Sequence, residues 1–264
     1  MLRFPPRRIL AAVDLSATSL RAWRAARALS ERFGASLEAV YCDNPPPSDL
    51  ALSNSPAIAA AMKKRVMDAL LRRLGPHQRL HSVRGAPERV LPRLARQGRF
   101  DLLVVGTHHR SGAARVLLGS VAEAVVRDCS CPVLAVPTAL RSVRRVLAPI
   151  NEADYARKSL LAAGLGARAY KARLTVLHVV TDPVFGPSPR KLLRTRLAEL
   201  AQDVRRDTRP EGVVRQSEPV REILRACRGK DLVVLAAHRK SLLGDWVLGT
   251  TAQRVLRHSR IAVL

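Results

Sequence analysis

The amino-acid sequence predicts an α/β protein of two tandem domains, each with a five-stranded parallel sheet and helices on both faces of the sheet. Three observations lead to this prediction. The chain repeats itself once, its short apolar runs alternate with longer amphipathic segments, and its 264 residues suit two domains of ordinary size. Apolar residues make up 47% of the chain, which is enough for each domain to bury a core of its own.

The internal repeat is visible in two pairs of segments. Residues 8–14 (RILAAVD) recur as residues 145–151 (RVLAPIN), and residues 101–106 (DLLVVG) recur as residues 231–236 (DLVVLA). The offset is 137 residues for the first pair and 130 for the second, which is longer than the period of a solenoid repeat. Each copy is therefore expected to fold as a domain.

The repeat divides the chain and its charge into two similar parts. We place the domains at residues 1–140 and 141–264, because the last apolar run of the first copy ends just before this boundary. The first part has 21 basic and 10 acidic residues, a net charge of +11, and the second has 25 and 11, a net charge of +14. The total charge of +25 attracts polyanions and nucleic acid, and charge-driven binding of such partners stays open as an alternative function.

The strands of each sheet are predicted from continuous apolar runs. In the first copy these are residues 9–13, 37–40, 102–105 and 133–136, each bounded by charge, Pro or Gly. Such runs are typical of strands that are buried on both faces, as in a parallel sheet. Strands that alternate with helices indicate a Rossmann-like or flavodoxin-like domain.

Two helices of the first copy have clear signals at their ends. Residues 19–33 have apolar residues at helical spacing and are followed by Gly34, a residue that commonly ends a helix. Residues 87–98 begin with Pro and end with Gly, as helices prefer. If the strands that end near Asp14 and Gly106 are neighbours, both residues open into one crevice at the carboxyl edge of the sheet, where ligands bind in such folds.

The loop from Gly106 to the next helix can be interpreted in two compatible ways, as a helix cap and as a phosphate site. Ser120 and Glu123 have the S-x-x-E spacing of a capping box, and residues 250–253 (TTAQ) repeat that pattern in the second copy. The same helix start also favours a phosphate, because its amides and dipole attract anions and Gly119 lets the anion approach the backbone.

The order of these features resembles the universal stress protein family over essentially the whole chain, as a tandem member. The resemblance includes the strand ending in Asp14, Ala86-Pro87 before a helix, the loop from Gly106 to Gly-Ser, and the last run, residues 131–136 (CPVLAV). In nucleotide-binding members the loop holds the ribose and phosphates of ATP. The resemblance implies a stress-response regulator that binds ATP or another adenine nucleotide, with Mg²⁺ as a possible companion.

The resemblance also implies a set of binding residues in the first copy, divided between the two parts of the nucleotide. The adenosine side is expected at Asp14, Cys42, Val105 and Gly106, and the phosphate side at His108, Gly119, Ser120 and Val121. A carboxylate suits the adenosine side, because it accepts hydrogen bonds from amino and hydroxyl groups but repels phosphate.

Both copies depart from the family loop. His109 stands at the second Gly position of the first copy, where its bulk can crowd the phosphates. In the second copy Asn151, Ala236 and Arg239 replace the Asp and both Gly residues, and only residues 249–250 (GT) are kept. Nucleotide binding is therefore expected chiefly in the first copy, whereas the loop of the second copy is degenerate and offers at most an anion site.

Two other sequence patterns are weaker indications of a binding site. Residues 164–169 (GLGARA) fit a dinucleotide fingerprint, but they lie within a predicted helix and not directly after a strand, so close helix packing explains them better. The thiols of Cys129 and Cys131, with residues 108–109 (HH), suggest a metal site, but structural zinc sites favour wider cysteine spacing. No metal site is expected.

The remaining expectations concern activity, location and partners. No general base is evident near the expected phosphates, so the protein is not expected to be an enzyme, although slow ATP hydrolysis stays open. With four cysteines, no CxxC motif and no long apolar segment, a reduced cytoplasmic protein without a membrane span is expected. The two copies are expected to pack as an intramolecular pseudo-dimer, and a further homodimer is possible. A scaffold that binds proteins and no nucleotide is the main alternative function.

Overall fold

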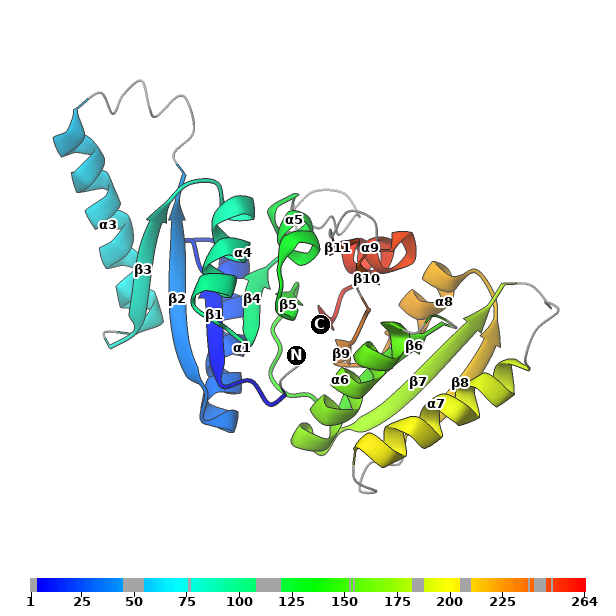
Figure 1. Ribbon diagram of the computed structural model, residues 1–264. Helices are drawn as coiled ribbons and strands as arrows, with labels where there is room; N and C mark the ends of the chain where they lie inside the picture. Colours follow the sequence, from blue (N-terminus) through cyan, green and yellow to red (C-terminus); the bar gives the residue numbers. More distant parts are fainter. Residues whose placement is uncertain are drawn as a thin grey trace. The chain divides into compact units, whose positions relative to one another are not determined.

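The structure is a computed structural model with two units, each a parallel sheet with its helices (Figure 1). The described residues are 4–44, 55–75, 77–107, 120–151, 153, 155–181, 188–204, 210–236, 238–239, 246–247 and 249–264. The first half takes its described residues from 6–139, and the second half from 4–5 and 140–264. The predicted domain limits, 1–140 and 141–264, and the predicted pseudo-dimer stay predictions.

The first half alternates strands and helices along the chain. Its strands lie in the order β3-β2-β1-β4-β5, and all of the pairings between them are parallel. This confirms the five-stranded parallel sheet. The elements are β1 (Arg8–Ala12), α1 (Ala17–Phe33), β2 (Ser36–Asp43), α3 (Pro56–Leu74), β3 (Arg79–Arg84), α4 (Pro87–Gln97), β4 (Leu102–Gly106), α5 (Ser120–Asp128) and β5 (Val133–Val136).

The second half repeats this topology. Its parallel strands lie in the order β8-β7-β6-β9-β12, which corresponds strand for strand to the first half. A short antiparallel pair, β10 with β11, is an addition that the sequence did not predict. The elements are β6 (Arg145–Ile150), α6 (Tyr155–Tyr170), β7 (Arg173–Val180), α7 (Pro189–Asp203), β8 (Glu211–Gln216), α8 (Pro219–Ala226), β9 (Leu232–Val233), β10 (His238–Arg239), β11 (Trp246–Val247), α9 (Thr250–His258) and β12 (Ala262–Val263).

The central strands of the first half are buried between two helix layers. Helices α1 and α3 contact each other, as do α4 and α5, and the two pairs lie on opposite faces of the sheet (Figure 1). Ile9, Leu10, Leu103 and Val104 have at most 1% of their surface exposed. Burial on both faces is the reason that these strands read as continuous apolar runs.

The ends of α1 follow from local chemistry. The Ser16 side chain accepts a hydrogen bond from the N–H of Ser19 at 3.2 Å. This N–H is one of those in the first turn that have no acceptor within the helix. Gly34 adopts a φ of 63°, and its N–H donates to the carbonyl of Ser30. The left-handed conformation is open to glycine, so the predicted stop after residue 33 is confirmed.

Close helix packing accounts for the first glycine of the Gly-x-Gly pattern in α6. A Cβ added at Gly164 would lie 2.6 Å from Cδ1 of Leu200 and 3.1 Å from Cγ2 of Val204, both in or beside α7. A side chain there would push the two helices apart. Gly164 therefore serves packing in this helix, as the sequence context predicted, whereas a Cβ at Gly166 would meet, among the described residues, only Phe4, at 3.7 Å.

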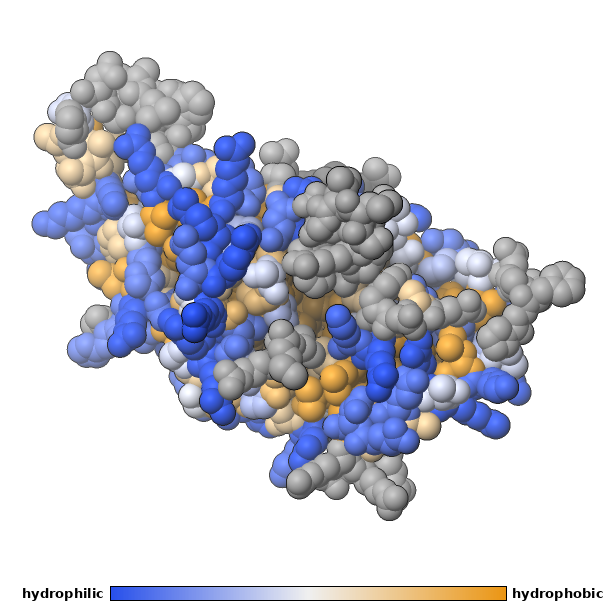
Figure 2. Space-filling model, viewed as in Figure 1, coloured by the Kyte–Doolittle hydropathy of each residue, from blue (hydrophilic) through white to orange (hydrophobic). Residues whose placement is uncertain are grey.

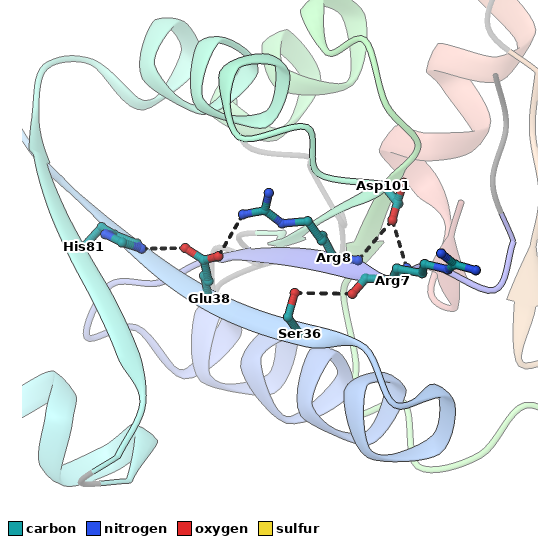
Figure 3. Close-up of polar contacts among 6 residues, drawn as sticks. All are labelled: Arg7, Arg8, Ser36, Glu38, His81 and Asp101. Carbon is teal, nitrogen blue, oxygen red and sulfur yellow. Dashed lines mark hydrogen bonds and ion pairs between the residues drawn. The ribbon is translucent and has the colours of Figure 1, made fainter.

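Each half ties its innermost strands together with an aspartate at the amino edge of the sheet. Asp101 Oδ2 accepts hydrogen bonds from the N–H groups of residues 7–8, at 2.9 and 3.0 Å (Figure 3). Asp231 Oδ2 does the same with the N–H groups of residues 144–145, both at 2.8 Å. We call these two contacts the aspartate clamps. They explain why Asp stands at the start of both repeated segments.

A second polar cluster, formed by Arg8, Glu38 and His81, lies near this edge of the first half. Glu38 accepts a hydrogen bond from Arg8 Nη2 at 3.1 Å and lies 2.7 Å from His81 Nε2 (Figure 3). Burial raises the pKa of the Glu38 carboxyl, but the bonds from His81 and Arg8 outweigh burial and hold that pKa below its ordinary value. At the corresponding position of the second half, Thr175 Oγ1 accepts from Lys230 Nζ at 2.6 Å.

Candidate functional site

The candidate site lies at the carboxyl ends of β1, β2 and β4. The strand order reverses at β1, because β2 and β3 lie on one side of it and β4 and β5 on the other. In open parallel sheets this reversal is where ligands bind. Since β1 is in register with both neighbours, Asp14, Cys42 and Gly106 all come to the same edge. The predicted adjacency of the strands ending near Asp14 and Gly106 is thus confirmed.

A tight turn after β1 holds Asp14. Its Oδ1 accepts a hydrogen bond from the N–H of Ser16 at 2.8 Å, an Asx-turn. Its own N–H donates to Ser19 Oγ at 3.1 Å, and Ser19 Oγ donates to the Asp14 carbonyl at 2.7 Å. The carboxylate is therefore half-buried and held in place by the first turn of α1.

Gly106 is required by the close approach of α1. A Cβ added at Gly106 would lie 2.7 to 2.8 Å from the backbone of Thr18 and Ser19, at the start of that helix. Backbone atoms cannot move aside as a flexible side chain does, so only glycine allows the helix to lie this close to the end of β4. The first glycine of the loop thus has a packing role whether or not a ligand binds.

The end of β2 is partly buried and lies close to several carboxylates. Burial, followed by the Glu88 carboxylate, raises the pKa of the Cys42 thiol to about 11. Burial, followed by the carboxylates of Asp43 and Asp14, raises the pKa of Tyr41. Of these acidic neighbours, Asp43 and Glu88 were not singled out from the sequence, because no local motif links residues on separate strands and helices.

The structure describes only part of the expected binding set. Asp14, Cys42 and Gly106 lie together at the edge, and the adjacent Val105 has 3% of its surface exposed, so its side chain is buried. Ser120 begins α5 and Val121 is 36% exposed. His108, His109, Gly119 and the side chain of Ser120, with its expected bond to the amide of Glu123, lie outside the described residues.

The second half keeps the turn but changes the side chain. Asn151 Oδ1 accepts a hydrogen bond from the N–H of Ala153 at 3.2 Å, as Asp14 does from Ser16. The amide oxygen thus replaces the carboxylate oxygen without loss of the turn. The difference between the halves at this position is the negative charge.

The second half also departs at the ends of its later strands. Ala236 stands where the first half has Gly106, and β9 ends at Val233, three residues before Ala236. The capping box predicted at residues 250–253 is wrong. Gly249 is the N-cap of α9 and its carbonyl accepts from the N–H of Gln253 at 2.9 Å, so Thr250 is already inside the helix and cannot cap it.

An ion pair occupies this edge of the second half. Glu218 caps α8 by accepting from the N–H groups of Val220 and Arg221, at 3.2 and 2.7 Å, and its Oε1 lies 3.5 Å from Arg254 Nη1 of α9. The first half has Ala86 at the position of Glu218. The sequence shows the substitution but not its contact with a helix some 30 residues later in the chain.

The described residues contain neither a metal cluster nor a membrane span. No group of three or more His, Cys, Asp or Glu side chains among them is arranged to hold a metal ion. None of the helices that these residues form is both long enough and apolar enough to cross a bilayer.

The fold is that of a duplicated parallel α/β protein. In each half the strand order reverses at the centre of the sheet, and in such folds ligands bind at the carboxyl ends of the strands at this point. The model of the universal stress protein family matches residues 6–137 and again residues 142–264. The chain therefore belongs to the universal stress protein family, as a tandem member with two copies of the domain. The resemblance found in the sequence is confirmed.

Individual relatives agree with this assignment. A universal stress protein of Methanocaldococcus jannaschii is 30% identical over 138 residues, which cover 49% of this chain and 81% of the relative. One from Thermus aquaticus is 30% identical over 135 residues, or 48% of this chain and 96% of the relative. The crystal structure of a universal stress protein from Archaeoglobus fulgidus covers 98% of both chains with a TM-score of 0.78, and at 17% identity it supports the fold.

Proposed function

We propose that the first half binds ATP or another adenine nucleotide and that this binding serves the regulation of a stress response. The observation that carries the proposal is the Asp14 carboxylate, which a turn holds at the point where the strand order reverses. Membership of the universal stress protein family supports it, because the family resemblance implies this ligand at this edge. A regulatory role requires binding and release, and no catalytic residue is assigned.

The electrostatics of the edge support a fixed orientation of the nucleotide. Carboxylates of Asp14, Asp43 and Glu88 surround the end of β2, and they suit the amino and hydroxyl groups of adenosine. The same charges repel phosphates, which we direct toward the N-terminus of α5. We assign the adenosine side to Asp14, Cys42, Val105 and Gly106 and the phosphate side, with Mg²⁺ as its counter-ion, to His108, Gly119, Ser120 and Val121.

We propose that the second half does not bind the nucleotide in this way. Asn151 provides no negative charge, and Ala236 and Arg239 replace the glycines of the family loop. The Glu218–Arg254 ion pair further distinguishes this edge from that of the first half. The proposed domains 1–140 and 141–264 therefore divide into a nucleotide-binding copy and a degenerate copy.

The test is calorimetric titration of ATP, with Mg²⁺, into the wild type, Asp14→Asn and Asn151→Asp. Asp14→Asn is expected to weaken binding by about tenfold, the loss that fits removal of one charge-assisted hydrogen bond. It is expected to leave thermal stability unchanged, because Asn151 shows that asparagine supports the same turn. Asn151→Asp is the matched control and is expected to leave the affinity unchanged.

Two outcomes contradict the proposal, and each favours a different alternative. An absence of heat with every adenine nucleotide favours a family member that acts as an interaction scaffold. Heat that disappears at moderate salt, with equal affinity for inorganic polyphosphate, favours charge-driven polyanion binding. A specific observation makes the latter a second candidate: hydrophilic side chains cover α4 (Figure 2), where Arg89, Arg93 and Arg96 are exposed on one helix.

A further inference from the structure

Two thiols of the first half lie in contact outside the candidate nucleotide site. Cys129 and Cys131 lie between the end of α5 and the start of β5, with Ser130 between them. Their Sγ atoms are 3.4 Å apart. A disulfide has an S–S length of about 2.05 Å, so the two sulfurs need to approach by about 1.4 Å to form a bond, a distance within the range of side-chain rotation.

The surroundings of the pair favour one thiolate beside one thiol. The hydrogen bond from the Cys131 thiol is the main cause that holds the pKa of Cys129 below its ordinary value. Burial opposes this effect, while the nearby backbone amides and the Arg96 charge add to it. The same hydrogen bond, followed by burial and the negative charge on Cys129, raises the pKa of Cys131. We assign Cys129, which is buried, as the nucleophile, and Cys131, which is partly exposed beside it, as the thiol that resolves the oxidised form.

The other two cysteines lack this arrangement. Burial raises the pKa of Cys227 to about 12, and burial and Glu88 raise that of Cys42 to about 11. Both thiols stay protonated at neutral pH, and a protonated thiol is a poor nucleophile. Cys227 therefore serves as an internal reference for an unreactive thiol.

The turn does not need sulfur in order to fold. At the corresponding positions of the second half stand Ser259 and Ile261. There Ser259 Oγ donates to the carbonyl of Ile261 at 3.0 Å and accepts from its N–H at 3.2 Å, so one hydroxyl closes the turn. A paired thiol at this place is accordingly a feature of the first half and not of the fold.

We propose that Cys129 and Cys131 form a reversible dithiol–disulfide site that a hydroperoxide oxidises. The Cys129 thiolate attacks one oxygen of the peroxide, the O–O bond breaks, and Cys129 sulfenic acid and hydroxide, or an alkoxide from an organic peroxide, are formed. The Cys131 sulfur then attacks the sulfenic sulfur. Its proton leaves with the sulfenic oxygen as water, and the S–S bond forms. Two thiols lose two electrons, which the peroxide accepts.

The test treats the full-length protein with hydrogen peroxide and counts free thiols after denaturation. Of the four thiols in the wild type, two are expected to disappear and to return after dithiothreitol, and peptide mapping is expected to find the cross-link within the Cys129–Cys131 segment. Cys129 is expected to react about tenfold faster than Cys227. Cys227→Ser, the matched control, is expected to lose the same two thiols.

Two variants separate the steps. Cys131→Ser is expected to stop at a Cys129 sulfenic acid that dimedone traps, and Cys129→Ser is expected to react no faster than the reference thiol. The proposal is overturned if all four thiols survive a peroxide dose that oxidises glutathione, or if the cross-link joins other cysteines or two molecules. Because mapping of the wild type alone decides between these results, a variant that fails to fold does not weaken the test.

Discussion

The two halves of the chain share an aspartate clamp at the amino edge of the sheet and differ in charge and loop residues at the carboxyl edge. At the amino edge both have an aspartate clamp with nearly equal distances, from Asp101 and from Asp231. At the carboxyl edge Asp14 becomes Asn151 and Gly106 becomes Ala236. The strand order is common to both halves. The comparison indicates that the aspartate clamp is a constraint common to both halves, and that the carboxyl edge is where their charges and loop residues have diverged.

The largest expected effect comes from placing a methyl group at the end of β4. Gly106→Ala puts a Cβ within 2.8 Å of the α1 backbone, so the helix must shift, and we expect a loss of about 3 kcal/mol in the free energy of unfolding. Urea unfolding of the full chain measures it. Ala236→Gly is the matched control, with an expected change of about 1 kcal/mol or less from backbone entropy. Equal effects for the two variants would show that the end of β4 is no more constrained than its counterpart.

The aspartate clamps are expected to contribute equally. Asp101→Ala and Asp231→Ala each remove an acceptor shared by two backbone N–H groups, and we expect each to lower the free energy of unfolding by about 2 kcal/mol. Urea unfolding with a spectroscopic probe in each half compares them. If one variant is neutral while the other is destabilised, the amino edge is not the common constraint that we infer.

The smallest expected effect concerns acid stability. The folded-state pKa of Glu38 lies below its ordinary value of 4.5, so its contribution is present above that value and is lost as the pH falls through the lowered pKa. Glu38→Gln is expected to lower stability at neutral pH by less than about 1 kcal/mol and to reduce the loss between neutral pH and about pH 3. Chemical denaturation across this range measures it. Glu31→Gln, at a solvent-exposed pair with Arg27, is the control; if its acid dependence changes as much, the Glu38 cluster has no special role.

The fold could be predicted from the sequence because its signals are local and repeated. Buried strands such as residues 102–105 are continuous apolar runs. Gly34 marks the end of a helix because glycine readily adopts the left-handed conformation found there. The duplication doubled each signal, so a weak pattern in one copy was supported by the other. The edge strand β3 has no fully buried residue and gave no apolar run, which explains why it was not among the strands located from the sequence.

The candidate site could be predicted only in part. The strand adjacency placed Asp14 and Gly106 together, but the reason for glycine at position 106 is the backbone of α1, which no pattern in the loop reveals. The capping box at residues 250–253 failed because spacing alone does not say which residue is the cap. Contacts between distant segments, such as Glu218 with Arg254 and Glu38 with His81, depend on the tertiary structure.

The turn that Asp14 and Asn151 both support has a consequence for how a duplicated domain diverges. Aspartate and asparagine have nearly the same shape, and a side-chain oxygen of each accepts the hydrogen bond of the turn, so we expect their exchange to have little effect on folding. On this expectation, natural selection on stability alone does not distinguish them. One copy can therefore lose an ionised group in a single substitution while it continues to fold, and any later specialisation starts from an intact scaffold.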